Sequence, residues 1–208
     1  MKKHIWLSLV LSLVLGSLRG QSAYDIRHAD FRIRIDTAEQ RVDGKAVYKI
    51  RMLQTADSIL WDAAPQVEIL SAGKHRFRRR NKKVVIYGRF RKGKSYEIPF
   101  LFRSHPVKGM YFTGWGTEAA EKQVWTQGQG KKNSSWMPGK DDTGERFTWN
   151  ITISFPAEYR IISNGQRISA SRKGAWKAVT YRMDKPVPYY LLFVGAGNWR
   201  VLRDTVAG

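Results

Sequence analysis

Two glutamines one residue apart, Gln127 and Gln129, are the side chains in this sequence whose spacing most clearly suggests a binding site. They lie in a long polar, glycine-rich segment that runs from Trp125 to Asp142 between two strand-like blocks. Gly128 and Gly130 flank Gln129 with backbone that carries no side-chain bulk. Gln129 is therefore open to an approaching ligand.

The length of this loop also indicates a binding role. A loop this long inside a compact domain is uncommon unless it binds something or is disordered. Its two tryptophans and the Met137-Pro138 pair argue against disorder. We therefore expect the loop to bind a ligand or to pack against a neighbouring domain. Taken alone, each glutamine is more often a surface or packing amide than a ligand-binding one.

Several kinds of catalytic chemistry are absent from the sequence. It has no cysteine, which excludes disulfides, thiolate metal sites and cysteine nucleophiles. No HExxH, phosphate-cradling GxxxxGK loop or serine triad signature occurs. No two of the four histidines have helical metal-ligand spacing; they are His4, His28, His75 and His105. The sequence therefore predicts neither a metal site nor a catalytic residue in this chain.

The formal net charge is +20, and positive charge is concentrated between Lys74 and Lys94, where eleven Lys or Arg residues occur without an Asp or Glu. Such a run could contact a polyanion or a membrane surface. It could also blunt the solvated edge of a hairpin against edge-to-edge pairing. We favour the protection of a hairpin edge, because the sequence signatures of nucleic-acid-binding modules are absent. No specific nucleic-acid partner is expected.

The N-terminus has the build of an export signal. MKKH is followed by an apolar run from Ile5 to Leu18 and then by small residues. This run is shorter than the roughly 20 residues that span a bilayer. The sequence therefore predicts a signal peptide over residues 1–22, no stable membrane anchor, and a periplasmic or secreted location in a bacterial envelope.

From Tyr24 onward the hydrophobic period is two, which is typical of strands. Alternation over Phe31–Ile35 and Val42–Met52, with a polar turn between them, predicts a hairpin with one wet face. Further strands are predicted at Ser58–Trp61, Gln66–Ser71, Lys83–Tyr87, Ser95–Phe102, Phe147–Phe155, Tyr159–Ile162, Trp176–Met183 and Tyr189–Val194, the last covered on both faces. No segment keeps a helical period for three turns, so we predict an all-β, sandwich-like domain.

Five short pieces of the sequence, in this order and spacing, resemble one family. They are Gly109–Phe112 (GMYF), Thr126–Gln129 (TQGQ), Pro138–Asp141 (PGKD), Ser163–Gly165 (SNG) and Met183–Gly197 (MDKPVPYYLLFVGAG). With them the chain resembles the N-terminal domain of the aminopeptidase N-like zinc metallopeptidases (gluzincins), which include the leukotriene hydrolases. The resemblance covers nearly all of residues 23–208. The chain departs from the family at Ser134, Gly139 and Thr143, where Arg, Cys and Pro are common.

The resemblance implies a saddle-shaped, mostly antiparallel β domain that packs on a thermolysin-like catalytic domain. It implies that Gln129 reaches the active site and helps to hold the free α-amino group of a peptide substrate, while Gln127 shares this role or orients the loop. An ammonium offers three donors, and a glutamine carbonyl on a held loop can accept one of them. The family's zinc and its GxMEN and HExxH motifs are expected after Gly208, so this chain alone should be inactive.

These inferences lead to one expected function and two alternatives. We expect the N-terminal, substrate-anchoring domain of an exported zinc aminopeptidase. The first alternative is a non-catalytic β-sandwich module that binds envelope polysaccharide or another polyanion, which the eight tryptophans and the basic run favour. The second is a scaffold that has kept the family fold without peptidase activity.

Overall fold

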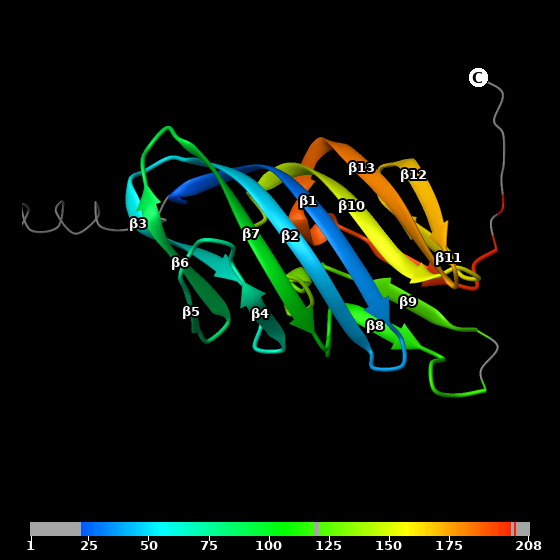
Figure 1. Ribbon diagram of the computed structural model, residues 1–208. Helices are drawn as coiled ribbons and strands as arrows, with labels where there is room; N and C mark the ends of the chain where they lie inside the picture. The colour runs from blue at the N-terminus through cyan, green and yellow to red at the C-terminus, as the bar shows by residue number, and fades with distance from the viewer. Residues whose placement is uncertain (1–21, 119–120, 201, 203–208) are drawn as a thin grey trace, which may run out of the picture.

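The computed structural model describes residues 22–118, 121–200 and 202, so the predicted signal peptide lies outside the described residues except for Ser22. The described chain is built of strands and two short 3₁₀ helices (Figure 1). None of its helices is long and apolar enough to cross a membrane. The predicted all-β, mostly antiparallel fold is confirmed.

The strands, in chain order, are β1 (Tyr24–Asp36), β2 (Arg41–Met52), β3 (Ala56–Asp62), β4 (Val67–Ser71), β5 (Phe77–Arg80), β6 (Lys83–Phe90), β7 (Ser95–Ser104), β8 (Met110–Thr113), β9 (Gln123–Thr126), β10 (Arg146–Pro156), β11 (Arg160–Ser163), β12 (Gln166–Lys173), β13 (Trp176–Pro188) and β14 (Val194–Gly197). The 3₁₀ helices are η1 (Asn133–Ser135) and η2 (Tyr189–Leu191).

Three sheets share one core. The largest has seven strands in the order β12-β13-β10-β1-β2-β7-β4, and only its β1–β10 pair is parallel. A four-stranded sheet, β11-β14-β9-β8, and a three-stranded sheet, β3-β6-β5, lie behind opposite ends of the large sheet (Figure 1). The two small sheets therefore cover one face of the large sheet and leave the other to solvent.

The alternation in the sequence explains this arrangement. The predicted hairpin forms as β1 and β2, which pair antiparallel. In β2 alternate apolar side chains, Tyr48 and Ile50 among them, are buried, while Lys45 and Lys49 point to the other face. Tyr48 lies at the centre of the core, with its ring centroid 4.5 Å from that of Trp61 in β3. This contact joins the large sheet to the three-stranded one.

The prediction of a strand from Tyr189 to Val194 is wrong. The first three residues form η2, and strand β14 begins only at Val194. The Tyr189 carbonyl accepts hydrogen bonds from the Leu192 N–H (3.0 Å) and from the side chain of Asn133 (2.7 Å), so it is not available to a sheet. Leu191 is 44% exposed, which a strand covered on both faces would not allow. An unbroken apolar run cannot distinguish these two backbones, because both bury apolar side chains.

Candidate functional site

Strand β9 leads directly into the loop that carries the two glutamines. Its last residue, Thr126, is buried, and the Thr126 hydroxyl accepts a 2.8 Å hydrogen bond from the Val194 N–H of β14. The Gln127 N–H donates to the Gly109 carbonyl (2.9 Å) on the other side. The chain is therefore held on both sides up to Gln127.

A tight turn then presents Gln129. Gly128 is buried, and a Cβ atom there would lie 2.2 Å from the Tyr190 carbonyl oxygen and 2.6 Å from the Asn133 amide nitrogen. The Lys132 N–H donates to the Gly128 carbonyl (2.9 Å) and closes the turn. Only glycine fits at position 128, so this contact sets the path by which the chain reaches Gln129.

Asn133 holds the base of the turn to η2. Its side chain is fully buried, and its amide nitrogen donates to the carbonyls of Tyr189 (2.7 Å) and Leu192 (3.2 Å). Its amide oxygen accepts from the indole N–H of Trp136 (3.0 Å). These three hydrogen bonds join Asn133 to Trp136 in the loop, to Tyr189 in η2 and to Leu192, which directly follows η2. Sequence reasoning did not single out Asn133, because its partners are up to 59 residues away.

The second half of the loop belongs to the core. Trp136 and Met137 are fully buried. The Pro138 carbonyl accepts from the Tyr48 hydroxyl (2.6 Å), and the Met137 carbonyl accepts from the Tyr189 hydroxyl (3.1 Å). This half is therefore a fixed base, and only the turn around Gln129 projects from it.

Gly139 explains one departure from the family pattern. A Cβ atom at this position would lie 2.2 Å from the Tyr189 ring, so the tyrosine occupies the space that a side chain would need. Gly139 also exchanges two backbone hydrogen bonds with Asp62, of 2.8 and 2.9 Å, which fix the loop to the end of β3. The Tyr189 ring thus fills the space that a side chain at position 139 would occupy.

Asp141 ends this anchored stretch as a buried carboxyl group. Its Oδ2 accepts from the Ser134 N–H (2.9 Å), and its own N–H donates to the Asp62 carboxylate (3.0 Å). Its Oδ1 has no hydrogen-bond partner among the described residues. Burial raises the pKa of Asp141, and the hydrogen bonds from Ser134 only partly oppose this shift.

The SNG turn supports the loop from behind. The Asn164 side chain donates to the Leu191 carbonyl (2.7 Å) and accepts from the Phe193 N–H (2.8 Å). The Ser163 hydroxyl donates to the Phe193 carbonyl (2.6 Å). These contacts fix the segment that approaches Gly128, so three of the separate sequence pieces form one continuous set of contacts.

The structure places both predicted site residues at the surface. The side chains of Gln127 and Gln129 are exposed, and neither makes a hydrogen bond to another residue in the part of the chain that the structure describes. Their carbonyl oxygens are free to accept from a ligand. Their role in binding stays a prediction.

A pair of aromatic rings lies beside Gln127. Tyr111 of β8 and Trp125 of β9 stack with centroids 4.6 Å apart, and both rings are half-buried. Side chains alternate along an extended chain, which places Trp125 and Gln127 on the same side. Trp136 and Trp115, from the same stretch of sequence, instead pack into or against the core. Among the described residues, no group of three or more His, Asp or Glu could hold a metal ion.

Comparison with known proteins gives two findings. The profile of the family described as the peptidase M1 N-terminal domain matches residues 23–191. A search of curated protein sequences found no match. The matched range contains the glutamine loop, η2 and the SNG turn.

Solved structures with a similar fold include M1 zinc metallopeptidases from Deinococcus radiodurans. One, a mutant bound to a Tyr-Ser-Ala substrate, is 17% identical with a TM-score of 0.74, and the match covers 86% of this chain and 43% of that one. The M1 zinc metallopeptidase without this mutation is 18% identical with a TM-score of 0.75, and the match covers 86% of this chain and 43% of that one. Yeast LTA4 hydrolase is 14% identical with a TM-score of 0.69, and the match covers 85% of this chain and 29% of that one. The chain therefore spans less than half the length of each of these proteins.

Proposed function

Because this chain belongs to the family of peptidase M1 N-terminal domains, we propose that it anchors the free N-terminus of peptide substrates for a zinc aminopeptidase of which it forms one part. The observation that carries the proposal is the position of Gln129. Its amide is exposed at the tip of a turn whose base is buried and hydrogen-bonded on both sides. A held acceptor of this kind loses little conformational freedom when a ligand binds.

The chemistry of a substrate ammonium suits this acceptor. The ammonium offers three N–H donors, and the Gln129 carbonyl oxygen accepts one through a charge-assisted hydrogen bond. Gln127 accepts a second or orients the loop. Lys131 and Lys132 follow Gln129 and disfavour a bound cation, so the negative charge that an ammonium requires comes from the catalytic domain.

Zinc chemistry belongs to that other domain in this proposal. The described residues offer no zinc ligand set, so this chain contributes binding and orientation rather than bond cleavage. The stacked rings of Tyr111 and Trp125 are half-exposed beside the glutamines and present apolar surface to the catalytic domain. We place the whole enzyme outside the cytoplasm on the basis of the N-terminal sequence, as a periplasmic or secreted protein.

The test is a peptidase assay of the full-length enzyme with Gln129→Ala, using matched peptides with a free and an acetylated N-terminus. Selective loss for the free peptide supports the proposal. An equal loss for both peptides would mean that the loop acts through packing. A full-length protein that cleaves no peptide would favour the scaffold alternative.

A further inference from the structure

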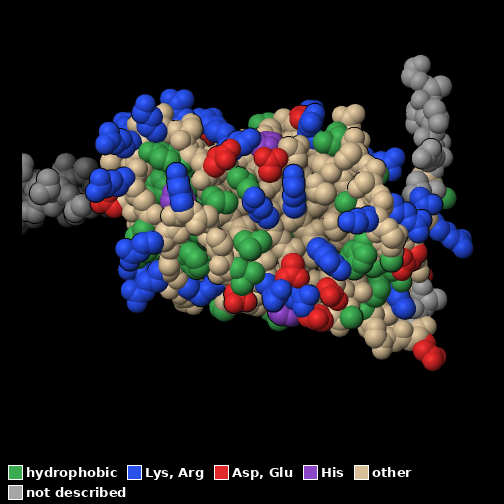
Figure 2. Space-filling model, in the orientation of Figure 1, with side chains coloured by type: hydrophobic (Ala, Val, Ile, Leu, Met, Phe, Trp, Pro, Cys, Tyr) green, Lys and Arg blue, Asp and Glu red, His purple; other side chains and the backbone are tan. Residues whose placement is uncertain are grey.

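The basic run from Lys74 to Lys94 is not explained by substrate anchoring. Two of its eleven cations have structural partners. Arg79 turns inward and donates to the carbonyls of Ala63 (2.8 Å) and Val67, and Lys83 pairs with Asp62. The other nine side chains are exposed, and none pairs with a carboxylate within the described residues. Figure 2 shows Lys and Arg side chains gathered at the end of the molecule where β3, β5 and β6 lie.

Protection of a strand edge accounts for only part of this charge. β5 is an edge strand of the three-stranded sheet, so Arg78 and Arg80 there do guard an open edge. Lys74 precedes this strand, and Arg89 and Lys92 follow on β6 and in the turn after it. Cations at these positions protect no strand edge and repel one another, which costs stability unless an anion binds.

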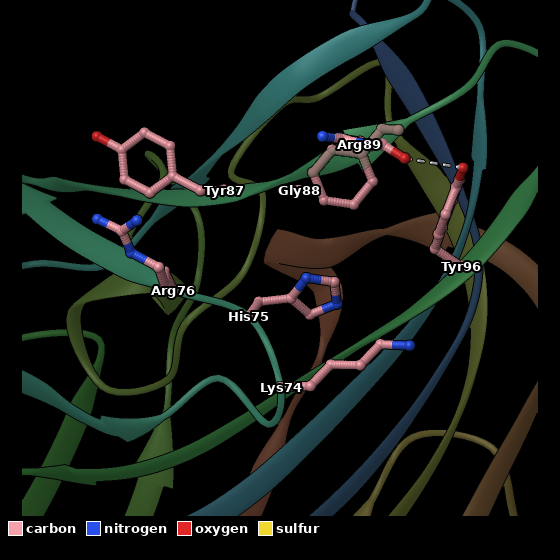
Figure 3. A pocket seen from close by; sticks show the side chains of 8 residues that line it. Lys74, His75, Arg76, Tyr87, Gly88, Arg89 and Tyr96 are labelled. Atoms are coloured by element: carbon pink, nitrogen blue, oxygen red, sulfur yellow. Dashed lines mark hydrogen bonds between the residues drawn. The ribbon is translucent and has the colours of Figure 1, made fainter.

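Part of the charge surrounds a hollow of about 470 Å³ between β6, β7 and the segment before β5. Figure 3 shows Arg76 and Tyr87 on one side of it, Lys74 and Tyr96 on the other, and His75 between them. The His75 ring stacks on Phe90 with centroids 5.7 Å apart. The hollow therefore has cationic walls and an aromatic floor.

Gly88 keeps this hollow open. It lies inside strand β6, where a glycine weakens the strand and often marks a close approach. A Cβ atom there would lie 2.9 Å from the Phe90 ring and 3.3 Å from His75 Nδ1. A side chain at this position would displace the rings that form the floor.

An exposed apolar side chain lies among the cations. Leu60 of β3 is 53% exposed and faces the same side of the sheet as Arg78, because both are in register with Val85. Phe77 is 38% exposed but is in register with Ile86, so it faces the opposite side of the sheet from Leu60. An aliphatic side chain such as Leu60 does not stack on sugar rings as an aromatic side chain does, whereas a lipid surface takes both cations and aliphatic side chains.

The N-terminal segment joins the fold at this same end. The Ala23 carbonyl accepts a 2.8 Å hydrogen bond from the N–H of Leu53, which is 43% exposed. The N–H of Met52, the preceding residue, donates to the Lys94 carbonyl (2.9 Å). The first described residues of the chain therefore lie beside the basic run.

From these observations we propose that the end formed by β3, β5 and β6 docks reversibly on an anionic phospholipid surface. The hollow between Lys74, Arg76 and Arg89 receives one lipid phosphate, while Leu60 enters the headgroup layer. This function is independent of substrate anchoring, because Gln129 takes no part in it.

The test is co-sedimentation of the full chain with vesicles of pure phosphatidylcholine and with vesicles that also contain phosphatidylglycerol. The variant carries Arg76→Glu, Arg78→Glu and Arg89→Glu. Each Lys or Arg near an anionic surface contributes ~1 kcal/mol, so the variant should bind anionic vesicles about a hundredfold more weakly. The N-terminal segment is common to all variants, so it cannot cause a difference between them.

The matched control carries Arg160→Glu, Arg167→Glu and Lys173→Glu, three exposed cations outside the basic run. It has the same net charge as the test variant and should keep most of the binding. Equal loss in both variants would overturn the proposal, because net charge alone would then explain the binding. Melting temperatures of both variants should match that of the wild type, since all six side chains are exposed.

A second variant separates a lipid surface from a soluble polyanion. Leu60→Ser should weaken vesicle binding by about tenfold, because the apolar side chain that enters the headgroup layer is lost. It should leave binding to heparin unchanged. Unchanged binding to vesicles would overturn the proposal in favour of a polyanion-binding surface.

Discussion

The Asn133 amide nitrogen lies 2.7 Å from the Tyr189 carbonyl oxygen, and this hydrogen bond joins the glutamine loop to a segment 56 residues further along the chain. Both residues are fully buried. Leaving a buried polar group unpaired costs folding free energy, so this hydrogen bond holds the loop against η2. Four predictions follow from this arrangement and from the groups around it.

Asn133→Ala should destabilise the fold by about 3 kcal/mol. The change leaves the Trp136 indole N–H and two buried carbonyls without the partners that Asn133 supplies. Urea denaturation followed by tryptophan fluorescence measures this loss. Gln129→Ala, at an exposed side chain in the same loop, is the control and should change stability by less than about 0.5 kcal/mol. Similar losses in both variants would show that Asn133 does not hold the loop.

Gly128→Ala and Gly130→Ala should differ sharply. At Gly128 the added methyl group meets the Tyr190 carbonyl at 2.2 Å, so the backbone must move, at about 2 to 3 kcal/mol. At Gly130 the nearest atom is the flexible end of Lys132, at 3.8 Å, and the cost is the strain of a left-handed backbone (φ 79°), about 1 kcal/mol. Thermal melts of both variants check this order, and the reverse order would contradict it.

Gln129→Ala in the full-length enzyme should lower kcat/KM for free peptides. The lost charge-assisted hydrogen bond is worth roughly 1.5 to 3 kcal/mol, or about ten- to a hundredfold. An N-acetylated peptide has no ammonium to lose and should change little. Gln129→Glu keeps an acceptor and should retain far more activity, whereas Gln127→Ala should cost less than Gln129→Ala if Gln127 only orients the loop. No change at all in Gln129→Ala would remove this residue from the site.

Stability should depend on pH through Asp141. Burial raises the pKa of this carboxyl group above its ordinary value of 3.8, so the folded state holds its proton to higher pH than the unfolded state does. The contribution of Asp141 to the free energy of unfolding therefore falls as the pH rises from about 4 through the raised pKa. Asp141→Asn cannot titrate and should flatten this part of the profile, as measured by urea denaturation across the acidic range.

The control for that profile is Asp57→Asn, at an exposed residue of β3. It should leave the pH profile of the wild type in place. Other carboxyl groups add their own dependence. Burial also raises the pKa of Glu145, whereas hydrogen bonds from Asn150 and from Arg103 lower the pKa values of Asp30 and Asp43. The difference between Asp141→Asn and wild type isolates the one group. If the free energies of unfolding of Asp141→Asn and wild type differ by the same amount at every acidic pH, the pH dependence does not come from Asp141.

Much of the fold follows from local pattern. Alternation over Val42–Met52 predicts strand β2 and its wet face, because a strand turns successive side chains to opposite faces whatever it packs against. The glycines around Gln129 likewise predict an exposed residue, since they act on the backbone beside it. The order of the short sequence pieces was enough to indicate the family.

The support of the site depends on contacts that no local pattern encodes. In the sequence Asn133 is one polar residue in a polar loop, and Tyr189 is predicted to belong to an apolar strand. Only the folded chain brings the loop and η2 together. The same holds for Gly139, whose missing side chain is matched by a ring 50 residues away in the sequence. A buried polar group must find a partner and a buried ring must find space, and both are set by which distant segments meet in the folded core.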